Sequence, residues 1–395
     1  MSSTTTAPGQ TEKGHIDPAA AFVPVQTRSE RPASFDPADF GTPTGREVNW
    51  KHTPLDRIAP LLVADAVPDE DALVTLITGH EQLEVGQLAA GEAPRGEVFV
   101  PEDVVAAAVW QRDRRASLLR VPAGVELAEP VTVEVHGRPG TAFEHLVIEA
   151  QPNSRATIVL RHDGETHLGQ NVEIIVREGA ALTLVSVQRW GQHAVHLASH
   201  QARVERSAAL THVVVSLGGG VVRVNPSVEL AGAGAEGRLF GLAFADAGQH
   251  LESQVYLHHE GPHTVGDVLY KAALQGASAR TVWIGDVLIG PDAVGTDSYE
   301  ANRNLVLTEG ARADSIPNLE IETGDILGAG HASATGRFDD EQLFYLQARG
   351  IREDEARRLV VLGFLSEIAQ KTGIPALEDE LVEAIERELA EGAAA

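Results

Sequence analysis

The sequence predicts a mainly β fold in which a solenoid of short strands lies between two smaller helical regions. From about residue 118 to residue 328 the chain carries short runs of alternating apolar and polar residues, bounded by Gly, Pro, Asn or Asp. Such runs are typical of β-strands. The clearest begin at Val131, Ala156, Val172, Leu182 and Leu210. Because no long helical stretch separates them, a doubly wound α/β fold is excluded.

An irregular internal repeat favours the solenoid. A turn of small residues recurs before the strands at intervals of about 24 to 40 residues, around positions 153, 178, 206, 234, 276 and 309. A single coil of this size cannot bury its own apolar face, so it buries that face against its neighbours. A β-helix with small residues at tight corners is therefore the first candidate. A β-sandwich with long connections is the alternative.

The regions before the solenoid read differently. Residues 1–45 are rich in Ser, Thr, Pro, Ala and Gly, and we expect a disordered or loosely ordered tail. Residues 46–117 are predicted to form an N-terminal helical domain, because Leu55, Ile58 and Leu61 repeat at helical spacing. Pro101 and the acids after it indicate the start of a helix whose body covers residues 104–110. The β-helix core is assigned to residues 118–330.

Residues 331–395 are predicted to form a C-terminal helical domain. One helix covers residues 339–348 and ends at Gly350, and a second runs from residue 353 to about residue 370. Pro375 opens a third, in which Leu377, Leu381, Ile385 and Leu389 recur at every fourth position. The last helix has only a short chain around it to cover this apolar stripe.

The charge of the chain argues against nucleic acid as a partner. The formal net charge is −26, from 31 basic and 57 acidic residues. Phosphate binding requires clustered Lys and Arg, and an acidic surface repels a polyanion. Most of these charges are expected to form a solvated surface, which could also accept a basic partner.

The absence of cysteine limits the chemistry further. With no Cys in the chain, neither a disulfide nor an all-cysteine site for zinc or an iron–sulfur cluster can form. The N-terminus lacks the apolar core of a signal peptide, and no run of about 18 apolar residues could span a membrane. These features predict a cytoplasmic protein without a membrane partner.

Common catalytic motifs are absent or unconvincing. No Gly-Lys dipeptide occurs, so we expect no phosphate-binding loop and no nucleotide bound by this chain itself. Neither His-Glu-x-x-His nor Gly-x-Ser-x-Gly occurs. Gly232, Gly234 and Gly237 match the dinucleotide fingerprint, but the residues after them read as a strand rather than as the helix that such a site needs. A glycine-rich corner of the solenoid is the better interpretation.

Histidine is plentiful, and two groups suggest metal binding. The first contains His193, His196 and His200, and the second contains His258, His259 and His263. Successive residues of a strand point to opposite faces, so His258 and His259 cannot both face one metal ion in a regular strand. We interpret both groups as separate surface or partly buried histidines.

Four stretches resemble the SufB/SufD family, and its SufD branch in particular. Residues 47–55, Glu-Val-Asn-Trp-Lys-His-Thr-Pro-Leu, resemble the N-terminal signature, with His52 in the usual place of Tyr and one extra residue before Trp50. Residues 121–133 are similar to the entry into the β-helix, and residues 265–297 to the region before the C-terminal signature. The most specific stretch runs from Pro317 to Ile351 and includes Asp325, His331 and Gly336.

The resemblance implies a right-handed parallel β-helix between small N- and C-terminal helical domains. It also implies a non-catalytic scaffold subunit of the Suf iron–sulfur cluster assembly complex. Such a subunit pairs with SufB through the β-helix and binds the SufC ATPase through the C-terminal helices, and dimerisation of the lone chain is left open. The nascent cluster of this family forms between a SufB cysteine and a histidine of the other subunit, which corresponds by position to His331.

His331 is therefore expected to bind a transient iron–sulfur cluster or iron at the junction with SufB. Imidazole can replace thiolate on iron, and a chain without cysteine supplies nitrogen only. Glu320, Glu322 and Asp325 lie nearby in sequence, and we expect them to attract iron or to orient the imidazole.

Two other functions fit a β-helix. One is an enzyme that acts on polysaccharide, and the other is an iron-binding enzyme that uses the histidine groups. The first would carry a signal peptide and a catalytic cluster along one groove, and neither stands out in the sequence. A scaffold should co-purify with an ATPase and a second β-helix subunit, whereas an enzyme should turn over alone.

Overall fold

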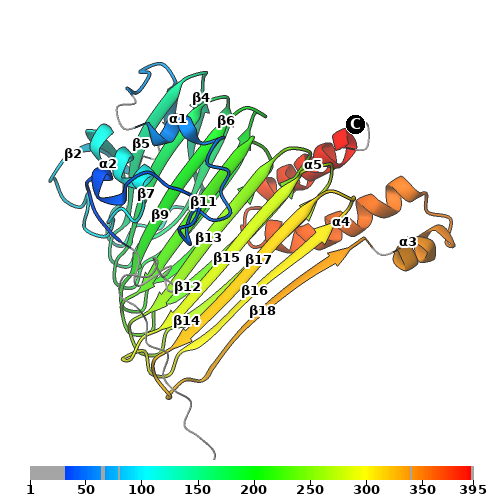
Figure 1. Ribbon diagram of the computed structural model, residues 1–395. Helices are drawn as coiled ribbons and strands as arrows, with labels where there is room; N and C mark the ends of the chain where they lie inside the picture. Colours follow the sequence, from blue (N-terminus) through cyan, green and yellow to red (C-terminus); the bar gives the residue numbers. More distant parts are fainter. Residues whose placement is uncertain (1–31, 64–66, 79–80, 339, 393–395) are drawn as a thin grey trace, which may run out of the picture.

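The computed structural model describes residues 32–63, 67–78, 81–338 and 340–392. These residues form a parallel β-solenoid with helices packed on its sides (Figure 1). The chain passes alternately through two sheets, so that each full coil adds one strand to each sheet. This architecture confirms the predicted β-helix and excludes the alternative of a sandwich with long connections.

Each sheet has nine strands among the described residues. In spatial order, sheet A contains β1 (Leu73–Thr78), β4 (Val131–Gly137), β6 (Arg155–Gly164), β8 (Ala181–Trp190), β10 (Ala209–Ser216), β12 (Glu236–Ala245), β14 (Val265–Leu274), β16 (Asp297–Val306) and β18 (Gly328–Arg337). Sheet B contains β17 (Arg312–Ile321), β15 (Arg280–Ile289), β13 (His250–His259), β11 (Val221–Leu230), β9 (Val195–Val204), β7 (His167–Val176), β5 (Thr141–Ala150), β3 (Arg115–Val121) and β2 (Glu84–Ala89). The solenoid thus continues to Arg337, past the boundary predicted at residue 330.

Helices are confined to the two ends of the chain. They are η2 (Pro37–Phe40), α1 (Ala59–Leu62), α2 (Val104–Arg112), α3 (Asp340–Gln347), α4 (Glu353–Gln370) and α5 (Pro375–Gly392). The last two begin where the sequence predicted. The sequence predicted that the helix now labelled α3 begins at residue 339. That residue lies outside the described ones, and the described part of α3 begins at Asp340. Among the described residues, no helix is long and apolar enough to cross a membrane.

The N-terminal region is less helical than the sequence predicted for residues 46–117. Its described residues contain two helices, α1 and α2, whereas β1 pairs antiparallel with β4 and β2 pairs antiparallel with β3. These two strands close the N-terminal ends of sheets A and B. The run from Leu73 to Thr78 has strong β propensity, with Val, Thr and Ile, and this signal was missed.

Left-handed residues stack at one corner of successive coils, as the small-residue repeat predicted. Asn153, Gly179, Ser207 and Gly234 have φ values of 58°, 69°, 55° and 67°. The backbone N–H of each donates to a carbonyl of the next coil, for example from Asn153 to Glu178 over 3.0 Å. Gly adopts this conformation without a steric cost, and Asn adopts it more readily than most other residues. Gly234 therefore turns a corner into β12 and does not open a helix, as the sequence indicated.

Buried carboxylates fix the N-terminal region to the outer face of sheet B. Glu173 accepts hydrogen bonds from the backbone N–H groups of residues 96, 98 and 99, at 2.7, 2.7 and 3.1 Å. Glu252 accepts from the Thr53 hydroxyl at 2.9 Å. Trp50 lies under the guanidinium of Arg223, whose carbon is 4.1 Å from the ring centroid. The Trp50–Thr53 part of the N-terminal signature thus attaches the segment to the solenoid.

The helices α4 and α5 cover the outer face of sheet A (Figure 1). Their apolar stripes pack on a sheet surface that is itself apolar, where each fully buried Val, Leu or Ile side chain contributes about 1.5–3 kcal/mol. Sheet A therefore covers the apolar stripe of α5. The sequence had suggested too little chain near this helix to cover the stripe. The contact joins Val361, Leu365, Ile368, Leu381 and Ile385 to Val185, Val213, Val215, Phe240 and Leu242.

The interior of the solenoid holds several buried histidines among its apolar side chains. The ring nitrogens of His162 lie 3.1 Å from the Val187 carbonyl and 3.1 Å from the Gln170 side-chain oxygen. His200 Nδ1 lies 2.9 Å from His212 Nε2. Burial lowers the pKa of His162 and of His212 to about 4. Since the charged form is disfavoured inside the solenoid, these side chains are neutral in the folded protein at pH 7.

We predict that this neutrality makes folding stability fall as the pH is lowered from 7 to 5. The unfolded histidines bind protons near pH 6.5, whereas the folded His162 and His212 do so only near pH 4. Protonation therefore favours the unfolded state, by about 2 kcal/mol for each histidine at pH 5. Urea unfolding of the wild type and of the double variant His162→Gln/His212→Gln at both pH values measures this contribution.

The comparison with the variant is needed because Glu300 acts in the opposite direction. Burial raises the pKa of Glu300 to about 8, so its proton uptake stabilises the folded state as the pH falls. We expect the wild type to lose about 3–4 kcal/mol more than the double variant between pH 7 and pH 5. Equal losses in both proteins would show that the two histidines are charged, or accessible to solvent, in the folded state.

Candidate functional site

The C-terminal end of the solenoid is open. Strands β17 and β18 are the last members of their sheets, and each has one neighbour among the described residues. In Figure 1, β18 lies at the edge of the stack, away from α1 and α2. Large apolar side chains are exposed around this end, namely Leu327 at 80%, Tyr299 at 55% and Ile321 at 45%. An uncovered sheet edge with apolar side chains is a surface for pairing with another chain.

His331 lies on β18 at this open end. Its neighbour in the sheet is Glu300 of β16, which follows Val268 of β14 in the same row of inward-facing residues. The row is apolar at Val268 and Leu239, contains the buried His212 one coil earlier, and is polar again in the last two coils. The His331 side chain is 46% exposed because no further coil covers it among the described residues. The sequence assigned His331 to the helical domain, whereas the structure places it within the last strand.

Glu300 lies beneath His331 and is fully buried. Its Oε1 atom is 3.8 Å from His331 Nδ1, which is longer than a hydrogen bond. Both carboxylate oxygens lack a hydrogen-bond partner among the described residues. Burial, with a further contribution from the nearby charge of Asp286, raises the pKa of Glu300. The side chain fits because residue 285 is glycine, where a Cβ atom would overlap the carboxylate.

The acidic residues predicted to assist His331 lie elsewhere on the last coil. Glu322 and Asp325 belong to the corner between β17 and β18, and both are exposed. The backbone carbonyl of Asp325 accepts a hydrogen bond from Gly295 at 2.7 Å. The Glu322 charge raises the pKa of His258, although burial lowers that pKa overall. The carboxylate closest to the His331 imidazole is that of Glu300.

The two histidine groups do not form metal sites in the described residues. No cluster of three or more His, Cys, Asp or Glu side chains has a geometry that could hold a metal ion there. His259 points into the solenoid, where its ring nitrogens lie 2.8 Å from Thr264 Oγ1 and 2.9 Å from Ser298 Oγ. His258 points outward, and its Nδ1 is 3.6 Å from Glu260. The expectation of surface or partly buried histidines is met by His258, whereas His196, His200 and His259 are fully buried.

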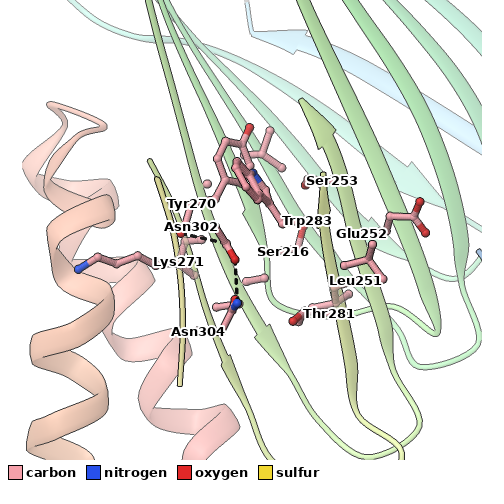
Figure 2. A pocket seen from close by; sticks show the side chains of 16 residues that line it. Ser216, Leu251, Glu252, Ser253, Tyr270, Lys271, Thr281, Trp283, Asn302 and Asn304 are labelled. Atoms are coloured by element: carbon pink, nitrogen blue, oxygen red, sulfur yellow. Dashed lines mark hydrogen bonds between the residues drawn. The ribbon is translucent and has the colours of Figure 1, made fainter. Parts of the chain in front are cut away.

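A small, mainly apolar cavity of about 30 Å³, with a few polar side chains in its wall, lies inside the solenoid near the open end (Figure 2). Figure 2 shows Asn302 and Asn304 between the sheets, with Lys271 directed away from them toward the helices. The Asn302 side-chain N–H donates to the Tyr270 carbonyl at 3.2 Å. The Tyr270 hydroxyl and the Trp283 indole N–H have no partner among the described residues. The volume is enough for one or two water molecules and not for an organic cofactor.

Sequence reasoning missed Glu300, although the sequence contained a signal for it. Inward positions of the earlier strands are mostly apolar, whereas those of β16 are Ser298, Glu300, Asn302 and Asn304 before Val306. A strand that is polar on its core-facing side departs from the pattern of an ordinary buried strand. The register between β16 and β18 is needed to single out Glu300 among these polar residues.

The fold and the site define a class of protein, a β-solenoid with one unfinished end that carries an exposed histidine. The family model for the SufBD core domain of the SUF iron–sulfur cluster assembly system matches residues 133–364, which is more than half of the chain. The chain belongs to the SufBD family of iron–sulfur cluster assembly proteins. The resemblance seen in the sequence is thereby confirmed at the level of the family.

Mycobacterial relatives agree with this assignment. An iron–sulfur cluster assembly SufBD family protein of Mycobacterium tuberculosis is 46% identical over 393 residues, which cover 97% of each chain. One of Mycobacterium leprae is 44% identical over 365 residues, covering 90% of this chain and 93% of that protein. A second Mycobacterium leprae member of the family is 28% identical over 318 residues, covering 78% of this chain and 36% of the longer relative.

Proposed function

We propose that this chain is a scaffold subunit of the SufD type in a cytoplasmic Suf complex. It pairs with a SufB subunit through the open end of its solenoid, docks the SufC ATPase through its C-terminal helices, and performs no catalysis of its own. The nascent iron–sulfur cluster, or the iron that enters it, is the cargo held at the junction. The observation that carries this proposal is the position of His331 on the last strand of an unfinished solenoid.

The uncovered end supports pairing with another solenoid of the same family. A partner with the same two-sheet cross-section could extend both sheets at once, with β17 and β18 pairing at their free edges. The same step would cover Leu327, Ile321 and Tyr299. Two family members from Mycobacterium leprae match this chain, one at 44% and one at 28% identity, which supports two different subunits in one assembly. A second copy of the chain could use the same end when SufB is absent.

The composition of the chain supports a division of ligands across that junction. Nascent clusters need sulfur ligands, and a chain without cysteine offers nitrogen and oxygen only. His331 lies half exposed on the edge strand, within reach of a partner's thiolate. Glu322 and Asp325 lie in the exposed corner before β18. They add negative charge at the open end of the solenoid and would attract ferrous iron.

The helices after the solenoid support a separate docking surface for SufC. Phe344 and Tyr345 of α3 are 72% and 55% exposed, and Leu359 of α4 is 43% exposed. The buried stripes of α4 and α5 hold the helices on sheet A, so these exposed side chains are free for a partner. Because the sequence has no Gly-Lys phosphate-binding loop, ATP hydrolysis is assigned to the docked subunit.

The two surfaces should separate in binding experiments. We predict that Ile321→Lys/Leu327→Lys weakens binding of the SufB partner at least about 100-fold, or about 2.7 kcal/mol, because two charges would be buried at the junction. Binding of SufC should be unchanged. Phe344→Ala/Tyr345→Ala should have the reverse effect, since it removes the exposed aromatic anchors of α3. Pull-downs and calorimetry with purified partners measure both constants.

Each variant serves as the control for the other, and Val67→Lys adds a third. Val67 is 81% exposed in the N-terminal region before β1, so a lysine there should affect neither partner. Unchanged SufB binding by the Ile321→Lys/Leu327→Lys variant would show that the open end is not the surface that binds SufB. Unchanged SufC binding by the α3 variant would remove that docking surface.

His331 should be required for cluster formation and not for assembly. We predict that His331→Ala leaves the fold within about 0.5–1 kcal/mol of wild type, because the side chain is half exposed. The complex should still form, whereas cluster formation in cells should fall about tenfold or more with the loss of a ligand. Co-purification and the visible absorption of the cluster report the two effects.

His258→Ala is the matched control, because His258 is a partly buried histidine on the outer face of sheet B. His259 is unsuitable, since its removal would leave Thr264 and Ser298 without their buried partner. Normal cluster formation by the His331→Ala complex would show that His331 is structural. A loss of complex formation would instead make His331 an interface residue.

A further inference from the structure

The carboxylate of Glu300 is in a state that ordinary folding does not explain. Its side chain is fully buried, and neither oxygen finds a hydrogen-bond partner among the described residues. A buried carboxyl group without partners costs several kcal/mol relative to one in water. The neighbouring coil has Val268 at the same position in the row, and an apolar side chain there packs without this cost. A polar group kept at this cost indicates a ligand that the carboxylate binds.

The surroundings of Glu300 place one of its oxygens beside His331 and the other beside Gly285. Gly285 on the facing sheet leaves the space that the carboxylate occupies. Trp283 of the same strand is buried in the interior beside Gly285 and limits access from inside the solenoid. On the next strand, the imidazole of His331 lies beside Glu300, with 3.8 Å between Oε1 of Glu300 and Nδ1 of His331. Oε1 is thus the carboxylate oxygen on the side of His331, whereas Oε2 lies against Gly285.

We propose that Glu300 is a second iron ligand of this chain, and that Glu300 and His331 together form an oxygen-and-nitrogen half-site for ferrous iron. The inference rests on the proposed function, because it places the iron at the end where the partner pairs. It adds a residue to that site and assigns a class of ligand to it. The half-site is completed by sulfur or oxygen ligands of the partner subunit.

The geometry suits one ion shared by the two side chains. Two ligand atoms that each lie about 2.1 Å from a first-row metal ion are about 3.0–3.4 Å apart in octahedral or tetrahedral coordination. The observed 3.8 Å separation therefore needs to close by less than about 1 Å. A rotation of the half-exposed His331 ring can supply this movement while Glu300 stays fixed.

The mixed donor set is compatible with ferrous iron, which is the ion that the proposed function brings to this end of the solenoid. Imidazole suits iron, zinc and copper, and its combination with a carboxylate occurs in both non-haem iron and zinc sites. Two ligands leave most of the coordination sphere open to ligands of the partner subunit. An incomplete site can receive iron and release it with the finished cluster, whereas a closed protein site would retain it.

Iron-directed backbone cleavage of the isolated full-length chain tests the half-site without any partner. Ferrous iron is added without oxygen at one equivalent, and ascorbate with hydrogen peroxide then generates hydroxyl radicals at the bound ion. Mass spectrometry maps the cuts. We expect cuts in β16 and β18 around Glu300 and His331, and at least a tenfold loss of these cuts in Glu300→Gln and in His331→Ala. His258→Ala is the control, and it should keep the cuts.

The two variants distinguish failure of this inference from failure of the proposed function. If His331→Ala abolishes the cuts and Glu300→Gln keeps them, His331 binds iron alone and the role of Glu300 is overturned. If neither variant changes the cuts, or no cuts fall in these strands, the iron site is elsewhere and the role of His331 fails with it. Glu300→Gln keeps the side-chain shape, and circular dichroism with thermal unfolding confirms that it is folded. If the Glu300→Gln variant does not fold, Glu300→Asp replaces it in the experiment. The shorter aspartate side chain moves the carboxylate away from His331, so this variant should give fewer cuts than wild type.

Discussion

Every coil of a parallel solenoid must be covered by another coil, and this constraint governs the rest of the structure. A coil of two short strands buries its apolar side chains only against its neighbours, so the first and last coils are always incomplete. At the N-terminal end, β1 and β2 run antiparallel to the strands beside them and stop the stack. At the C-terminal end, no such pair occurs among the described residues, and the last two strands keep free edges. The two ends of the molecule therefore have different roles.

The sides of the stack are covered by segments that the chain adds before and after it. Sheet A is apolar on its outer face and receives α4 and α5, while sheet B uses buried carboxylates such as Glu173 and Glu252 to hold the N-terminal region. Those carboxylates have backbone and hydroxyl donors that satisfy them. Glu300 has none among the described residues, although it is as deeply buried. The contrast separates a carboxylate that holds the fold together from one that is kept for a ligand.

The sequence predicted the parts of the fold that depend on local patterns. The β-helix, the corner at Gly234 and the two long C-terminal helices follow from alternation, small turn residues and helical spacing. It did not predict that sheet A would cover the stripe of α5, because that requires knowing which strands carry apolar residues on both faces. It also placed His331 after the solenoid, because the small and polar residues of β18 lack the apolar alternation that marked the other strands. Glu300 could be recognised only once the register between β16 and β18 was known.

The central claim is that the open end of the solenoid is where a second subunit binds. Hydrogen–deuterium exchange of the backbone amides in β17 and β18 tests it most directly. It is measured on the isolated chain at a concentration where it is monomeric, and again with its co-expressed SufBD family partner. Amides at the free edges should exchange quickly in the isolated chain and be protected at least about 100-fold in the complex, because new sheet hydrogen bonds form there. A complex in which β17 and β18 exchange as they do in the isolated chain, with protection on another face, would contradict the account.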